Sequence, residues 1–225
     1  DSSFLQAIVV GLTNLVFTLV AIRLIDRLGR KPLLIIGTLA MTIALSMATL
    51  AFNNASYEVN EKTLKNIENT DMREALASLS GSTFNSQKEL FDNVQPILSE
   101  EQLFSFKRNE VKNLIQINAT LVLIAILLYV AAFAISLGPV MWTLLSEIFP
   151  GNIKGIAISV VGFFNSLVSY TVTQFFPWEL TNLGPTLTFA IYAIMAFLSL
   201  LFVMKFIIET KGKSLEEVEE LLIKS

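Results

Sequence analysis

Five long stretches of the sequence contain no charged residue, and they constrain the fold more than any other feature. They cover residues 4–22, 32–52, 113–146, 155–178 and 180–204. Each is close to, or longer than, the roughly 20 residues that a helix needs to cross about 30 Å of hydrocarbon. Transmembrane strands would instead show about 10 residues of alternating polarity. The sequence therefore predicts an all-α membrane protein with five transmembrane helices.

The charged residues between these stretches predict how the helices are oriented. The loop 23–31 carries four basic residues and one Asp, and short loops rich in Lys and Arg stay in the cytoplasm. Residues 1–52 then hold two transmembrane helices and residues 53–112 form an extracytoplasmic insertion. Residues 113–208 hold three more transmembrane helices, and residues 209–225 form a cytoplasmic tail.

Two segments outside the predicted spans show signals for short helices. Ser86 with Glu89, and Ser99 with Gln102, have the spacing of capping boxes, so we expect the insertion to be partly helical. It is either a lid or partner-binding surface, or an insertion tolerated because it lies outside the membrane. In the tail, a third such pair precedes an apolar stripe that predicts an amphipathic helix lying against the membrane domain. The pair is Ser214 and Glu217, and the stripe is Leu215, Val218, Leu221 and Leu222.

The composition argues against several classes of function. The sequence contains no Cys and no His, which excludes disulfides, thiolate metal sites and the usual side chain that titrates near neutral pH. It shows no nucleophile paired with a base, no metal cluster and no phosphate-binding glycine loop. We therefore expect neither an enzyme nor a metal site, and no nucleic-acid partner.

Four separated motifs together resemble the sugar-porter family of the major facilitator superfamily. They are Asp26-Arg27-Leu-Gly29-Arg30-Lys31, Gly138-Pro139-Val-Met-Trp142, Ser146-Glu147-Ile-Phe-Pro150 and Glu209-Thr-Lys-Gly212-Lys-Ser214-Leu-Glu-Glu217. The resemblance implies helices eight to twelve of a twelve-helix carrier. Residues 128–150 are most similar to bacterial D-xylose:proton symporters, and Ala134 stands where facilitative glucose transporters typically have Glu.

By this resemblance, three side chains are sugar ligands. Asn14 and Asn165 lie in the middle of uncharged stretches, where an amide is costly unless it faces protein, water or a ligand. Trp142 matches the family's Trp that stacks on sugar, since an indole covers the C–H face of a pyranose and its N–H can donate to a hydroxyl. The alternatives are contact between helices for the amides and a membrane-interface position for Trp142.

Two further groups of residues are expected to serve the transport cycle. Pro139, next to Gly138, removes a backbone hydrogen bond and should kink or break its helix, as a gate or hinge requires. The resemblance also implies a cytoplasmic network of charges that holds the two halves of the carrier together when it faces outward. Its expected members are Asp26, Arg27, Arg30 and Glu147.

The uncharged stretches bear on energy coupling. Proton relays in membranes need ionisable groups, so a coupling proton, the only cofactor-like group expected, should bind outside this sequence. The odd number of spans and the abrupt start suggest that a preceding half is missing, and the resemblance places the coupling carboxylate there. We expect a sugar:proton symporter for a monosaccharide such as xylose or glucose, in the lipid bilayer of a bacterial cytoplasmic membrane. A facilitative carrier, a non-transporting sugar sensor and an inert remnant stay open.

Overall fold

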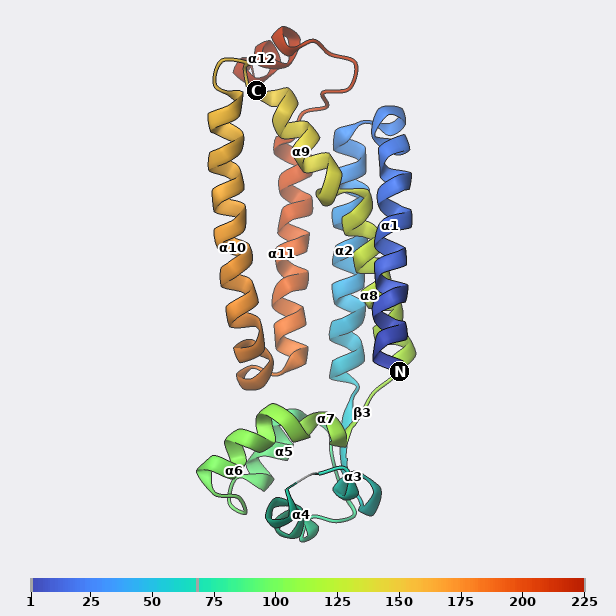
Figure 1. Cartoon of the computed structure of the whole chain (residues 1–225), viewed down its shortest axis with the longest axis vertical. Helices are drawn as coiled ribbons and strands as arrows, with labels where there is room; N and C mark the ends of the chain where they lie inside the picture. Colours follow the sequence, from blue (N-terminus) through green and yellow to red (C-terminus); the bar gives the residue numbers. More distant parts are fainter. Residues whose placement is uncertain (1, 68, 225) are drawn as a thin grey trace.

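A bundle of long apolar helices forms most of the molecule (Figure 1). The computed structural model describes residues 2–67 and 69–224. In this part of the chain, five helical segments are long and apolar enough to cross a membrane. They are α1 (Ser2–Leu28), α2 (Arg30–Asn53), α8 with α9 (Ala119–Ile135 and Leu137–Ile148), α10 (Lys154–Asn182) and α11 (Pro185–Phe206).

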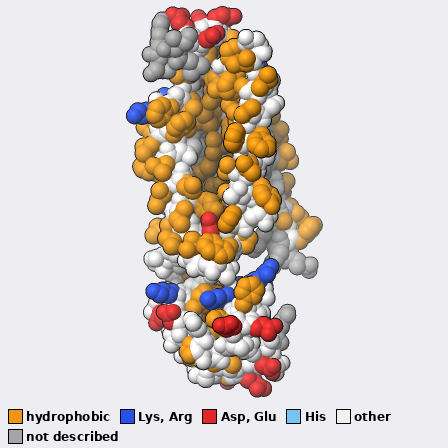
Figure 2. Space-filling model, turned by 90° about the vertical axis from the view of Figure 1, so that its left-hand side faces the viewer, with side chains coloured by type: hydrophobic (Ala, Val, Ile, Leu, Met, Phe, Trp, Pro, Cys, Tyr) orange, Lys and Arg blue, Asp and Glu red, His pale blue; other side chains and the backbone are white. Residues whose placement is uncertain are grey.

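The outer surface of the bundle is hydrophobic. Large apolar side chains are exposed along every spanning helix, and they cover the face shown in Figure 2. Water-soluble proteins rarely expose contiguous apolar patches of this extent. This surface is suited to lipid, so the chain is a multi-pass membrane protein.

Small residues hold the bundle together around α2. Ala44, Ala48 and Ala51 of α2 are buried, as are Ala193 and Ala196 of α11, and α2 packs closely on both α11 and α8. Small side chains allow helix backbones to approach closely in membranes. In contrast, no residue of α10, which the structure describes completely, is buried.

Two expected boundaries differ from the structure. The basic segment 23–31 is not a loop, because α1 continues to Leu28 and α2 begins at Arg30, with only Gly29 between them at φ +98°. The third span begins at Ala119 and not at residue 113. Residues before it are uncharged for another reason: Leu114 is fully buried in a separate core, and Ile115 pairs in a sheet.

That separate core belongs to a small insert domain, defined here as residues 54–118. Its three strands, β1 (Ser56–Val59), β2 (Ser82–Phe84) and β3 (Ile115–Gln116), form an antiparallel sheet in the order β2-β1-β3. Tyr57 pairs with Phe84 on one side and with Ile115 on the other. The sequence predicted only helices here, so this sheet is an addition to the all-α prediction.

Short helices complete the insert domain. They are α3 (Glu61–Lys65), α4 (Thr70–Ala77), α5 (Gln87–Val94), α6 (Glu100–Ser105), the π-helical turn η1 (Phe106–Glu110) and α7 (Val111–Leu114). The predicted capping box at Ser99 and Gln102 is confirmed. At α5, Ser86 caps the helix as predicted, but the Glu89 carboxylate accepts from the backbone N–H of Asn85 and not of Ser86.

The chain ends in the amphipathic helix α12 (Leu215–Lys224). Its capping box is present: the Ser214 N–H donates to the Glu217 carboxylate at 2.8 Å, and the Glu217 N–H donates to Ser214 Oγ. Val218 is buried, and α12 packs against α9. The side chain of Leu222, expected on the same stripe, lies outside the described residues.

Candidate functional site

A bidentate ion pair joins two of the four predicted network residues at the end of the bundle away from the insert domain. Arg30 Nη2 and Nε donate to the Glu147 carboxylate at 2.7 and 3.0 Å, and only 13% of the Arg30 side chain is exposed. The guanidinium also donates to the carbonyl of Ile25. Planar two-point pairing gives Arg–carboxylate contacts both strength and geometric specificity, so the start of α2 is fastened to the end of α9.

Asp26 and Arg27 take smaller parts in this cluster. Asp26 Oδ1 lies 3.8 Å from Arg30 Nη1, and its side chain is 80% exposed, so this contact is weakly held. Arg27 is exposed and contributes its backbone carbonyl, which accepts from Lys211 Nζ. The structure therefore brings Arg30 and Glu147 together, and places Asp26 and Arg27 at the edge of the cluster.

Glu209 was missed as a member of the cluster, although its motif supported the resemblance. Its carboxylate accepts from the backbone N–H groups of Arg30 and Lys31, each at 3.1 Å. These N–H groups are in the first turn of α2, where they have no partner within the helix. Glu209, in the segment after α11, thus caps the N-terminus of α2 although it lies 179 residues after Arg30 in the sequence.

The surroundings of Glu209 favour its ionised form. Burial opposes the charge, but hydrogen bonds from the backbone N–H groups of Lys211, Arg30 and Lys31 outweigh burial, and the pKa of Glu209 is lowered. Next to it, the buried Thr210 donates to Glu147 Oε2 at 2.6 Å. A Cβ on Gly29 would lie 2.5 Å from Glu209 Oε2, so this close approach requires glycine.

The helix break lies two residues before Gly138. Ser136, with φ −117° and ψ −93°, separates α8 from α9, and Leu137 to Ile148 then continue as a helix through Pro139. Proline is tolerated in the first turn of a helix, because its missing N–H would have no partner there. Ser136 itself is fully buried against α2: a Cβ on Gly37 would lie 1.8 Å from its hydroxyl oxygen.

Trp142 lies one turn beyond Pro139 and reaches α10. The tip of its indole is 3.8 Å from the position that a Cβ on Gly162 would occupy, and the side chain is 42% exposed. Asn165 is three residues after Gly162 on the same helix, and residues at that spacing share a helix face. The geometry therefore places Trp142 and Asn165 on neighbouring surfaces of α9 and α10, and both residues are exposed.

Asn14 lies in a different part of the bundle. It is exposed on α1 and accepts a hydrogen bond from Thr18 Oγ1 at 3.3 Å. Figure 1 shows α1 and α10 at opposite edges of the bundle, with α2 and α11 between them. The structure therefore does not bring Asn14 next to Asn165.

Comparison with known proteins identifies the family. The family described as sugar (and other) transporter matches residues 1–68 and 101–222. The chain belongs to this family. The D-xylose-proton symporter of Escherichia coli K12 is 33% identical over 98% of the chain, and facilitated glucose transporter member 10 of Xenopus tropicalis is 28% identical over 98%.

Solved structures of a sugar transporter share the fold. The inward-open conformation of the xylose transporter XylE from E. coli aligns with 98% of the chain at 33% identity and a TM-score of 0.65. A double-Trp mutant of XylE aligns with 99% of the chain at a TM-score of 0.67. These matches show that the bundle has the fold of a major facilitator superfamily transporter, as the motifs predicted.

The chain spans only part of these relatives. It covers 34% of the E. coli symporter and 44% of the Xenopus transporter. The family match also leaves out residues 69–100, which include α4, α5 and β2 of the insert domain.

Proposed function

We propose that the chain supplies part of the binding site and a gate of a secondary sugar carrier in a bacterial cytoplasmic membrane. The substrate would be a monosaccharide such as xylose or glucose. The carrier would need further helices, supplied by the rest of a longer chain or by a second polypeptide. The observation that carries this proposal is an exposed Trp142, directly after a broken helix and against Gly162 of α10.

The proposed chemistry at this place is recognition without covalent steps. The Trp142 indole would cover the C–H face of a pyranose, and its N–H would donate to a hydroxyl. Asn165 offers one acceptor and two donor hydrogens, which suits vicinal hydroxyls. Asn14 is exposed on α1 and lies away from Trp142 and Asn165. It would contact the sugar only in a binding site that the additional helices complete.

The break at Ser136 would allow alternating access. Broken helices near the middle of the membrane are where transporters bind substrates and where gates bend. In this proposal, α9 moves relative to α8, with Gly138 and Pro139 in its first turn. The Arg30–Glu147 pair and the Glu209 contacts would stabilise the packing of the helix ends in one of the two states of the carrier, outward-facing or inward-facing. A small bias is enough to shift such an equilibrium.

Proton coupling is the leading form of this function, and facilitated diffusion is the alternative. The similarity to a D-xylose-proton symporter supports the first. The glucose facilitated diffusion protein of Zymomonas mobilis, 30% identical over 98% of the chain, supports the second. We place the coupling group outside the chain, because residues 4–22, 32–52, 113–146, 155–178 and 180–204 contain no Asp, Glu, Lys, Arg or His.

Uptake by the complete gene product that carries this chain tests the proposal. Labelled xylose and glucose would be followed into proteoliposomes with and without an inward proton gradient. We expect accumulation that requires the gradient, and losses of at least tenfold in kcat/KM for Trp142→Ala and for Asn165→Ala, on the order of 1.4 kcal/mol each. Equilibration without accumulation would assign facilitated diffusion.

Two matched variants control for general damage. Phe197→Ala removes an exposed aromatic side chain from α11, and Asn93→Ala removes an exposed amide from the insert domain. Both should transport at the unaltered rate. Sugar binding without flux would favour a sensor, and absence of both binding and flux would refute the carrier.

A further inference from the structure

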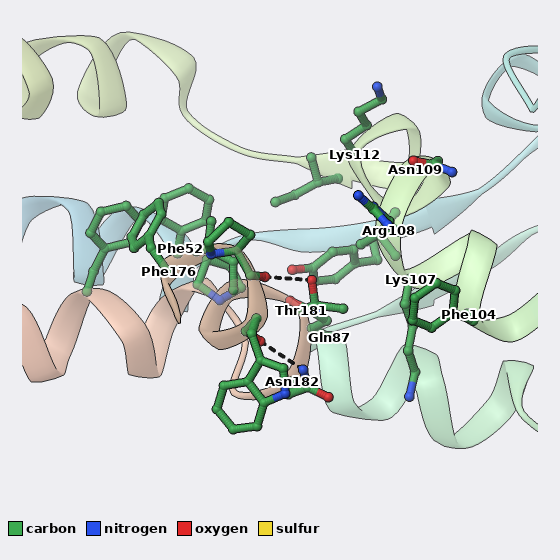
Figure 3. A pocket seen from close by; sticks show the side chains of 18 residues that line it. Phe52, Gln87, Phe104, Lys107, Arg108, Asn109, Lys112, Phe176, Thr181 and Asn182 are labelled. Atoms are coloured by element: carbon green, nitrogen blue, oxygen red, sulfur yellow. Dashed lines mark hydrogen bonds between the residues drawn. The ribbon is translucent and has the colours of Figure 1, made fainter. Parts of the chain in front are cut away.

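A cavity of about 800 Å³ lies where the insert domain meets the ends of the spanning helices. One wall comes from α6, η1, α7 and neighbouring parts of the insert domain, and the other from the ends of α2, α10 and α11 (Figure 3). The cavity is separate from Trp142 and from the Arg30–Glu147 cluster, which do not line it. Nothing in the proposed transport mechanism uses it.

The insert domain makes its wall of the cavity positively charged. Lys107, Arg108 and Lys112 line it, and the described lining residues include no carboxylate. Arg108 and Lys112 are exposed, whereas Lys107 is half-buried with its Nζ 4.9 Å from the centre of the Phe91 ring. Figure 2 shows Lys and Arg side chains at this junction, with Asp and Glu side chains next to them on the insert domain. Concave sites lined by one sign of charge concentrate ions of the opposite sign.

The helix ends make the opposite wall aromatic. Phe52, Phe176, Trp178 and Phe189 line it, with Phe52 and Phe189 stacked at 5.3 Å between ring centres. Trp178 is 56% exposed. Aromatic side chains, Trp above all, concentrate where the hydrocarbon of a membrane meets its head groups.

An irregular helical turn presents the basic side chains. In η1 the end residues Phe106 and Glu110 are buried, whereas the residues between them, Lys107, Arg108 and Asn109, line the cavity. The carboxylate of Glu110 accepts from Asn113 Nδ2 at 2.9 Å. π-Helical turns occur frequently at functional sites. The three middle residues of this turn all border the cavity, and Lys107 does so with its amine against the Phe91 ring.

We propose that this cavity binds the head group of an anionic phospholipid. Aromatic groups line the cavity on the side of the spanning helices, and cations line it on the side of the insert domain. An acyl chain and a phosphate follow one another in the same order along a lipid molecule. The phosphate diester would bind between Arg108 and Lys112, since the planar guanidinium offers paired donors to phosphate oxygens. The upper part of an acyl chain would lie along Trp178 and Phe176. The bound lipid would hold the insert domain against the membrane.

Quenching of Trp178 by brominated lipid tests this proposal directly. Residues 1–225 contain two Trp residues. Trp142→Phe, with any Trp outside these residues also changed to Phe, leaves Trp178 as the single reporter. The full chain would be reconstituted in phosphatidylcholine vesicles containing a minor, equal fraction of either brominated phosphatidylglycerol or brominated phosphatidylcholine. We expect stronger quenching by brominated phosphatidylglycerol than by brominated phosphatidylcholine. In Arg108→Gln/Lys112→Gln, the relative affinity for phosphatidylglycerol should fall by roughly fivefold for each cation removed.

A matched pair on the same domain provides the control. Lys62→Gln/Lys65→Gln removes the same charge from exposed positions of α3 that do not line the cavity, and the lipid preference should persist. Equal quenching by the two lipids, or equal losses in both double variants, would overturn the site. If inorganic phosphate alone abolished the preference, the cavity would be a site for free anions and the lipid assignment would be wrong.

Discussion

At the scale of single residues, Gly29 is required both by its positive φ and by its close contact with Glu209. Gly212, which has a positive φ but no such contact, separates the two causes. Gly29 has φ +98°, and an added Cβ would meet the Glu209 carboxylate at 2.5 Å; Gly212 has φ +73° but nothing within 4 Å. Both Gly→Ala changes introduce strain of about 1–2 kcal/mol. Gly29→Ala should lower the free energy of unfolding in detergent by about 0.5–2 kcal/mol more, because the Glu209 carboxylate must move and loses its hydrogen bonds from the N–H groups of Arg30 and Lys31.

Chemical denaturation followed by circular dichroism measures this difference. Equal losses for Gly29→Ala and Gly212→Ala would mean that Glu209 does not cap α2. Sequence reasoning placed Gly29 inside a loop over residues 23–31 and left Glu209 without a partner, whereas Gly29 is the single residue between α1 and α2. Its contacts join positions 179 and 178 residues apart, and no local pattern encodes such a pairing.

At the scale of elements, the packing of α2 against the helix break depends on Gly37. A Cβ there would lie 1.8 Å from Ser136 Oγ and 2.1 Å from Ser136 Cβ. Gly37→Ala should therefore destabilise the bundle by about 1–3 kcal/mol. Gly11→Ala in α1, where nothing lies within 4 Å, should be neutral or slightly stabilising, because Ala favours helix.

A second change identifies the cause of the Gly37 effect. Ser136→Gly removes the two nearest of the three atoms that an alanine at position 37 would meet and leaves the Ala132 carbonyl oxygen at 3.0 Å. Adding it to Gly37→Ala should therefore restore part of the lost stability. Thermal unfolding in detergent would measure Gly37→Ala, Gly11→Ala, Ser136→Gly and the double variant Gly37→Ala/Ser136→Gly. If Ser136→Gly does not restore any of the stability lost in Gly37→Ala, the contact with Ser136 is not the cause of the loss.

The elements that sequence reasoning found and missed differ in physical origin. The spans could be predicted, because charged side chains are costly in hydrocarbon and a helix needs about 20 residues to cross it, so each span leaves a long uncharged stretch. The break was predicted from Pro139, although it lies at Ser136. All three strands of the insert domain were missed: β2 has three residues and β3 only two, and the partners that they share in β1 are distant in sequence.

At the scale of the whole molecule, the membrane bundle and the insert domain have separate cores. Twelve buried residues among those described in the insert domain form one cluster. The two connections of this domain to the bundle are the adjacent strands β1 and β3. A domain whose ends are neighbours can fold without the chain on either side. Residues 54–118 expressed alone should therefore unfold cooperatively in water, although a domain of this size is marginally stable.

Two Phe residues in neighbouring positions test whether that isolated domain keeps the packing described here. Phe106 is fully buried in the core, and Phe104 is 66% exposed. Phe106→Ala should cost about 3–5 kcal/mol and leave the isolated domain unfolded, whereas Phe104→Ala should change its melting temperature little. Circular dichroism and urea denaturation measure both. Equal effects of the two substitutions would mean that the insert domain depends on contacts with the bundle, and its cavity wall would then form only when the helices are present.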